Sequence, residues 1–161
     1  MEYADDGDLF QKITDRQQES TTMTESEIWT NFIQIVRGLR AMHDLNIMHR
    51  DLKSANVFLN KDNTVKLGDM NVSKVVSQRS LNYTQTGTPY YASPEVWKDE
   101  PYDFKSDIWS LGCVLYEMIA LKPPFQATDM NGLYKRVIRG QFPKIPKNYS
   151  NDLWYMVCQL L

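Results

Sequence analysis

The chain has 161 residues, of which 42% are hydrophobic and 24% are charged, a balance that fits one globular domain and excludes a disordered or fibrous protein. Its 18 basic and 20 acidic residues give a net charge of −2, too little positive charge for broad binding to nucleic acid or an anionic membrane. Two cysteines and two histidines exclude a disulfide framework and offer few zinc ligands, so we expect both cysteines to fill core space in a reducing compartment.

The first predicted elements are a long helix and a hairpin. Thr24 is followed three residues later by Glu27, which is a capping box. Apolar residues then recur at helical spacing, and this pattern predicts a helix over residues 25–43. Two short apolar runs, 57–59 and 65–67, flank a polar stretch, which is typical of a small β-hairpin.

The second half of the chain is predicted to be mostly helical. Residues 69–104 show no sustained period and predict a long irregular connection. Apolar residues predict a buried helix over 105–121, too short and too interrupted by polar residues to span a membrane. A further helix is predicted over 129–139, and another begins near Leu153. The predicted fold class is therefore mainly α with a small β-hairpin.

Residues 49–56, just before the hairpin, have the side chains best suited to chemistry. Asp51 could accept a proton from a hydroxyl, Lys53 could neutralise a transferring phosphoryl group, and Asn56 could offer its oxygen to Mg²⁺. Asp69 follows the second hairpin strand, so the hairpin should bring it beside Asn56 as another oxygen ligand. The alternatives are a charged surface loop at 49–56 and a simple turn at Asp69.

Four segments in order resemble the motifs of eukaryotic protein kinases. His49-Arg50-Asp51 with Asn56 is similar to the catalytic loop, and Asp69-Met70-Asn71 stands where an Asp-Phe-Gly motif is expected. Ser93-Pro94-Glu95 resembles Ala-Pro-Glu, and residues 107–112 resemble the helix that anchors the catalytic loop. Lys53 and Thr88 resemble the serine/threonine branch, which implies transfer of the ATP γ-phosphate to protein Ser or Thr.

Further segments look like the NIMA-related (NEK) kinases, among them 1–9, 86–91 and 140–143. The resemblance covers the whole chain but begins at the hinge, so residues 1–161 are expected to form a partial protein kinase domain. That domain would comprise the hinge and most of the C-terminal lobe of the protein-kinase-like α+β fold, without the N-lobe and the last helices. The chain alone is expected to be inactive, because the glycine-rich loop and strand lysine that hold ATP phosphates are missing from it.

The resemblance also implies the roles of individual residues in catalysis. Asp51 and Lys53 would be catalytic, and Asn56 and Asp69 would hold Mg²⁺ at the phosphates of ATP. The backbones of Glu2 and Ala4 would bind adenine at the hinge, and Phe58 would form the apolar floor beneath it. The alternative for each of these three residues is ordinary packing, and for Phe58 both interpretations can hold together.

Other residues would regulate or support the site. Arg50 beside the catalytic Asp implies activation by a phosphate, with Thr84 as the best acceptor and Ser77, Ser80 and Thr86 as rivals. Thr88 would lie in the loop that meets the substrate. His49, Glu95 and Asp107 would be structural, and the arginine that usually pairs with Glu95 would lie beyond Leu161.

The expected partners are ATP and protein substrates with Ser or Thr, without nucleic acid or membrane. The resemblance implies an intracellular protein, in the cytoplasm or at the cytoskeleton, centrosome or basal body. The alternative function is a non-catalytic kinase-like interaction module or a truncated gene product without activity. The retained Asp51, Asn56 and Asp69 argue against a non-catalytic module, whereas the absent N-lobe argues against activity in this chain.

Overall fold

The computed structural model describes residues 4–68, 74–75 and 89–161. The elements in chain order are α1 (Leu9–Gln18), α2 (Glu25–Asp44), β1 (Ile47–Met48), the 3-10 turn η1 (Ser54–Asn56), β2 (Val57–Leu59), β3 (Val65–Leu67), β4 (Lys74–Val75), α3 (Pro94–Trp97), α4 (Phe104–Ala120), α5 (Met130–Arg139) and α6 (Asn151–Leu160). The predicted class, mainly α with a small hairpin, is confirmed. Within the described residues, no helix is long and apolar enough to cross a membrane.

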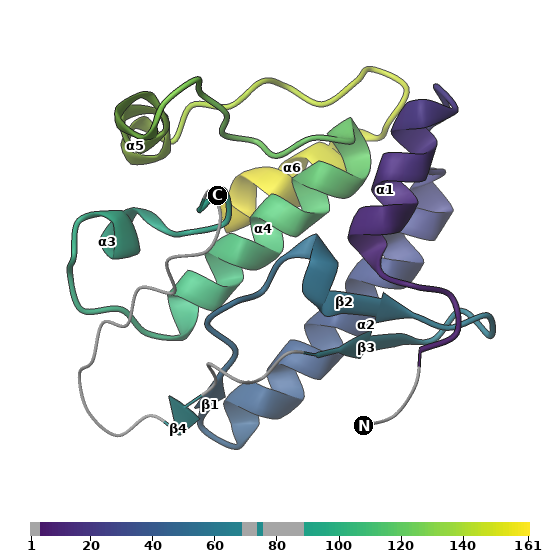
Figure 1. The fold of residues 1–161 in the computed structure, drawn as a ribbon, viewed down its shortest axis with the longest axis horizontal. Coiled ribbons are helices and arrows are strands. Elements are labelled where there is room, and N and C mark those ends of the chain that lie inside the picture. The colour runs from purple at the N-terminus through teal and green to yellow at the C-terminus, as the bar shows by residue number, and fades with distance from the viewer. Residues whose placement is uncertain (1–3, 69–73, 76–88) are drawn as a thin grey trace.

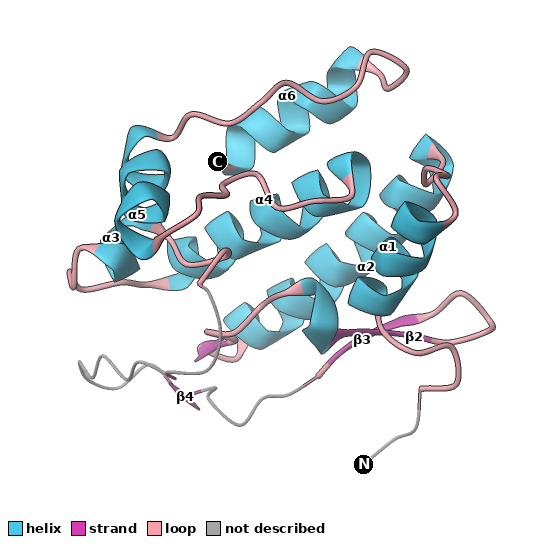
Figure 2. Ribbon diagram, turned by 45° about the horizontal axis from the view of Figure 1, so that its top comes forward, coloured by secondary structure: helices cyan, strands magenta, loops and turns pink. Residues whose placement is uncertain are grey.

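Helices α2 and α4 form the centre of the fold (Figure 1). Helix α2 contacts α4 and β3, while α4 also contacts α6. In the turned view, α6, α4 and α2 follow one another from top to bottom, with the strands below α2 (Figure 2). Ile35 of α2, Leu115 of α4 and Leu153 of α6 are fully buried in the same core cluster. The apolar faces of three helices therefore build one core, as their spacing predicts.

Helix α2 matches the predicted helix, but its capping box is only half formed in the described structure. The Thr24 hydroxyl accepts a hydrogen bond from the Glu27 backbone N–H at 3.2 Å. The Glu27 carboxylate contacts Lys12 of α1, with 2.7 Å between the charged atoms. Helix α1 was not predicted, because only Leu9 and Ile13 of its ten residues are buried. Its polar composition gives a weak helical pattern.

The predicted hairpin is confirmed as the antiparallel pair β2–β3, with Phe58 opposite Lys66. The N-terminal segment lies along the free edge of β2. The Leu59 N–H donates to the Gly7 carbonyl at 2.9 Å, and the Asp6 N–H donates to the Leu59 carbonyl at 3.1 Å. This pairing places the segment before α1 next to the strand that contains Phe58.

The prediction of an irregular connection over 69–104 was partly wrong. The short strand β4 pairs antiparallel with β1, and Pro94 begins the single-turn helix α3. A two-residue strand and a four-residue helix are too short to produce a detectable period in the sequence. Most of the remaining connection, 69–73 and 76–88, lies outside the described residues.

The later helices follow their predictions closely. Asp103 caps α4 by accepting the Lys105 N–H at 2.8 Å, and Gly140 ends α5 in the left-handed conformation. Cys113 is buried in α4, as expected, but Cys158 on α6 is exposed, so that prediction was wrong. Cys158 follows Val157, whose side chain faces the core, and one residue further turns the helix by about 100°.

Candidate active site

The loop between β1 and β2 is fixed at its start by Asp107 of α4. The Asp107 side chain is buried, and its two oxygens accept the backbone N–H groups of His49 and Arg50, each at 2.9 Å. Hydrogen bonds to an ionised acceptor are about twice as strong as neutral ones. The first residues of the loop are therefore attached to the buried central helix.

His43, near the end of α2, is a third partner of Asp107. Its Nε2 lies 2.8 Å from the Asp107 oxygen that also accepts the His49 N–H. The ring also packs against Phe104 at 4.6 Å between centroids. Sequence reasoning missed this contact, since the available signal was a lone histidine in the last turn of a predicted helix.

The next residues of the loop bring three functional side chains together. The Lys53 ammonium donates to Asp51 Oδ2 at 2.7 Å, and the Asn56 amide nitrogen donates to the same oxygen at 3.1 Å. Asn56 also donates to the Asp51 carbonyl at 2.7 Å. The side chains of Asp51 and Lys53 remain 31% and 34% exposed. The Asp51 carboxylate is therefore held in one orientation while solvent can still reach it.

The chemistry of Asn56 suits a hard cation. Both of its hydrogen bonds to Asp51 use the amide nitrogen, which leaves the amide oxygen as the atom that can face a metal. Asp69, the second proposed ligand, lies outside the described residues. Over residues 4–68, 74–75 and 89–161, no three His, Cys, Asp or Glu side chains are grouped to hold a metal. An oxygen pair from Asn56 and Asp69 fits Mg²⁺ chemically.

His49 and Arg50 have contrasting surroundings. Burial lowers the pKa of the His49 imidazole, although the nearby charges of Asp107 and Asp51 oppose the shift, so His49 is neutral at neutral pH. Arg50 has a left-handed backbone, with φ of 69°. Its guanidinium lies 5.8 Å from the ring centroid of Tyr102, a cation–π contact that the sequence did not suggest.

A buried hydrogen-bonded group connects this loop to the segment before α3. The Tyr91 hydroxyl donates to the Glu117 carboxylate at 2.7 Å and lies 3.0 Å from the Ser54 hydroxyl. Burial raises the pKa of Glu117, while its hydrogen bond from Tyr91 opposes that shift. The Ser110 hydroxyl also donates to the Tyr91 carbonyl at 2.9 Å. Sequence reasoning singled out none of these four side chains as a functional residue.

Glu95 of α3 has a partner within the described structure. The Ser106 hydroxyl donates to its carboxylate at 2.5 Å, and Ser93 lies 2.9 Å from Ser106. These serines attach α3 to the start of α4. The sequence analysis addressed only the usual arginine partner of Glu95, and no signal in the sequence pointed to this serine.

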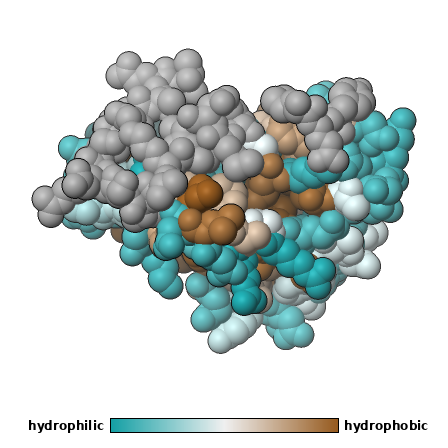
Figure 3. All heavy atoms as spheres, turned by 90° about the horizontal axis from the view of Figure 1, so that it is seen from below, coloured by the Kyte–Doolittle hydropathy of each residue, from teal (hydrophilic) through white to brown (hydrophobic). Residues whose placement is uncertain are grey.

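The predicted nucleotide site lies beside β2. Phe58 is half-buried, and a Cβ at Gly68 would lie only 2.5 Å from its ring, so that glycine lets the two strands approach. Ala4 is partly buried at the start of the segment that pairs with β2. Figure 3, which views the molecule from below, shows hydrophobic residues at the surface on this side. Phe58, Val65 and Leu67 are partly exposed apolar residues of these strands.

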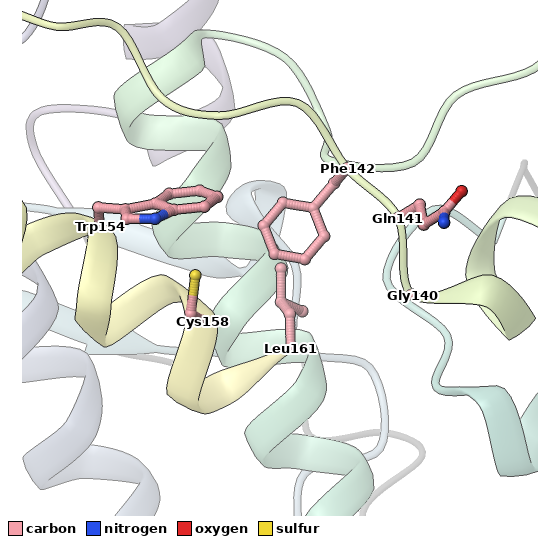
Figure 4. Close-up of a pocket in the computed structure, with 6 residues that line it drawn as sticks. All are labelled: Gly140, Gln141, Phe142, Trp154, Cys158 and Leu161. Carbon is pink, nitrogen blue, oxygen red and sulfur yellow. The ribbon is translucent and has the colours of Figure 1, made fainter.

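Four predicted site residues lie outside the described residues, namely Glu2, Asp69, Thr84 and Thr88. Their roles stay predictions. A separate surface hollow lies beside α6 (Figure 4), lined by Gly140, Gln141, Phe142, Trp154, Cys158 and Leu161. Among the predicted site residues that the structure describes, none lines this hollow.

Asp51, Lys53 and Asn56 converge in one loop that is attached to a buried aspartate of a central helix, an arrangement that fits the predicted protein kinase catalytic loop. A family model of the protein kinase domain matches residues 1–159. The chain belongs to the protein kinase domain family. Protein kinases as a family generally use ATP and Mg²⁺.

The curated relatives confirm the resemblance to NEK kinases. The chain is 45% identical over 161 residues to mouse "Serine/threonine-protein kinase Nek1", covering 99% of the chain and 13% of that protein. It is 41% identical over 162 residues to mouse Nek4, covering all of the chain and 20% of that protein. It is 46% identical over 166 residues to "Probable serine/threonine-protein kinase nek3" of Dictyostelium discoideum, covering 100% and 15%. The chain thus spans a fifth or less of the length of these relatives.

Proposed function

We propose that the protein containing this chain transfers the γ-phosphoryl group of ATP to Ser or Thr hydroxyls of other proteins, with Mg²⁺. The observation that carries the proposal is the orientation of the Asp51 carboxylate. Its Oδ2 accepts hydrogen bonds from the Lys53 ammonium at 2.7 Å and from the Asn56 amide nitrogen at 3.1 Å. In the proposed domain, residues 1–161 form the hinge and most of the C-terminal lobe. The phosphates would be held from the other side by donors elsewhere in the protein.

Each loop residue has a distinct proposed task. Asp51 orients the substrate hydroxyl and accepts its proton, because its carboxylate is fixed yet partly exposed. Lys53 stabilises negative charge that develops during transfer, since its ammonium lies beside the same carboxylate. The amide oxygen of Asn56, together with Asp69, would hold Mg²⁺, which neutralises phosphate charge when bound.

The nucleotide and the regulatory phosphate would occupy neighbouring surfaces. The backbones of Glu2 and Ala4 would bind adenine, with Phe58 beneath the ring. Arg50, whose guanidinium contacts the Tyr102 ring, would bind a phosphate on Thr84. Thr88 would meet the substrate. We further propose a cytoplasmic location, on the family resemblance alone.

The test is a pair of Asp→Asn variants in the full-length protein. Asp51→Asn removes the proposed base, and we expect phosphate transfer from Mg·ATP to a generic basic protein to fall by about 10²–10⁴-fold. Nucleotide binding should stay unchanged, because Asp51 acts on the hydroxyl and not on adenine. Asp44→Asn is the matched control, since Asp44 is exposed at the end of α2 and pairs only with exposed Arg40 among the described residues.

Undiminished transfer by Asp51→Asn would remove Asp51 from the proposed role. A wild-type protein that binds nucleotide but transfers no phosphate would instead favour the non-catalytic alternative. Phosphoamino-acid analysis of the labelled product distinguishes Ser and Thr from Tyr.

A further inference from the structure

Helix α5 and the segment after it concentrate positive charge. From Met130 to Ser150 the sequence contains five basic residues and no acidic residue. We call these five the basic strip, namely Lys135, Arg136, Arg139, Lys144 and Lys147. All five side chains are exposed. Because the whole chain has a net charge of −2, the other residues together carry −7, so the strip is a local exception to an acidic protein.

No ion pair among the described residues involves the basic strip. Lys135 and Arg139 are four residues apart on α5, opposite the buried Leu133 and Val137, and like charges at this spacing destabilise a helix. The helix dipole favours basic residues in the last turn, which accounts for Arg136 and Arg139. It does not account for Lys135, or for Lys144 and Lys147 beyond the helix.

Apolar side chains accompany the charge. Met130 and Tyr134 of α5 are 52% and 36% exposed. The Tyr134 ring also packs edge-on against Trp97 of α3 at 6.1 Å, which holds it in place. Helix α5 lies at the outer edge of the molecule, at the end away from the β2–β3 hairpin (Figures 1 and 2). Aromatic residues, Met and Arg are enriched where proteins bind proteins, and fixed aromatic rings lose little entropy on binding.

We propose that the basic strip, with Tyr134 and Met130, binds an acidic segment of a partner protein that also presents an apolar residue. The partner's carboxylates would meet the unpaired cations, and its apolar residue would pack against Tyr134. The acidic remainder of the chain would repel a long polyanion such as nucleic acid. A short acidic peptide segment can contact the strip alone. None of the strip residues belongs to the catalytic loop, so binding is independent of catalysis.

The test measures binding of a fluorescein-labelled peptide of glutamate and serine with a central leucine to the full-length protein, by fluorescence anisotropy. A matched peptide with glutamine in place of glutamate should bind much more weakly. Binding should weaken when salt rises from roughly 0.01 to 0.15 M, because exposed charge pairs are screened. Asp51→Asn should bind the peptide like wild type, which separates this proposal from the proposed kinase activity.

Charge reversal locates the site. Lys135→Glu with Arg139→Glu should weaken binding about tenfold, since two exposed attractions become repulsions. Arg37→Glu with Lys122→Glu makes the same charge change at exposed cations outside the strip and should leave binding unchanged. Because Glu in the last turn of α5 opposes the helix dipole, Lys135→Gln with Arg139→Gln provides a milder variant, and circular dichroism checks the fold of each.

Wild-type affinity in both strip variants would overturn the proposal, as would equal weakening by the strip and control pairs. Strip-dependent binding to phosphatidylserine vesicles but not to the peptide would identify a membrane surface instead and would also overturn it. A third result would also refute a separate partner protein: the wild type associates with itself, the strip variants do not, and the peptide does not bind. The occupant of the strip would then be a second copy of this protein.

Discussion

Replacing Asp107 by Asn tests how much the catalytic loop depends on one buried carboxylate. Both Asp107 oxygens accept a loop N–H, and one of them also contacts His43. Asparagine keeps the shape but has one oxygen. If that oxygen keeps the contacts with His49 and His43, the amide NH₂ of the new asparagine faces the backbone N–H of Arg50. Both groups are donors, so neither the NH₂ nor the Arg50 N–H has an acceptor there.

The size of the effect follows from these bonds. A buried donor without an acceptor costs about 1–3 kcal/mol. The remaining bond to His49 loses its charge assistance, which roughly halves its strength. We therefore expect Asp107→Asn to reduce the free energy of unfolding by about 3 kcal/mol, a large part of the 5–15 kcal/mol that is typical of domains. Because the loss occurs next to Asp51, phosphate transfer should fall by about 10²-fold through misplacement of the loop.

Urea unfolding of the full-length protein, followed by tryptophan fluorescence, measures the stability. Asp103→Asn is the matched control on the same helix, because Asp103 caps α4 from an exposed position. Asn and Asp cap helices about equally well, so this variant should unfold and react like wild type. If Asp107→Asn unfolds at the same urea concentration as Asp103→Asn and retains full activity, Asp107 does not hold the loop as inferred here.

Three further variants test polar contacts outside the loop. Tyr91→Phe should lower stability by about 1–2 kcal/mol, because Glu117 loses its hydroxyl donor; exposed Tyr155→Phe is the control, and equal stability of the two variants would contradict the role of Tyr91. Burial raises the pKa of Glu117 above 4.5, so its contribution to stability is complete below pH 4.5 and is lost as pH rises through the folded pKa. Urea unfolding measured across pH should show that Glu117→Gln lacks this decline. If the free energy of unfolding falls with pH equally in wild type and Glu117→Gln, this role of Glu117 is refuted. Hydrogen bonds from Ser150 lower the pKa of Glu25 below 4.5, so the contribution of Glu25 to stability is present above pH 4.5 and is lost as pH falls through the folded pKa. Glu25→Gln should flatten this acid decline of stability in urea unfolding, and an unchanged acid decline would contradict the role of Glu25.

Features set by local sequence could be predicted. The catalytic loop is eight residues long, so its chemical groups and their spacing are visible together. The hairpin is equally local, because two apolar runs and their turn fall within eleven residues, and its register follows from the turn. Helix α2 has an apolar face that repeats over twenty residues. Each of these elements contains its own signal.

Contacts between distant segments could not be predicted in the same way. His43 and Asp107 are 64 residues apart, and Ser150 donates to Glu25 across 125 residues. No periodicity relates such pairs, because the packing of α2 against α4, and of α4 against α6, decides which polar groups meet. Tyr91 and Glu117 belong to the same class. Their side chains look like ordinary helix or loop residues until the fold brings them together.

Asp107 shows how the two kinds of information combine. The motif identifies the residue, but the fold explains why it must be a buried carboxylate. Arg50 adopts a left-handed backbone with φ of 69°, which costs a non-glycine residue about 1–2 kcal/mol. The charge-assisted bond from the Arg50 N–H to Asp107 contributes about 1.5–3 kcal/mol and offsets that strain at the same residue. The turn that orients Asp51 is therefore stable only while α4 supplies the carboxylate, so the catalytic geometry depends on the helical core and not on the loop sequence alone.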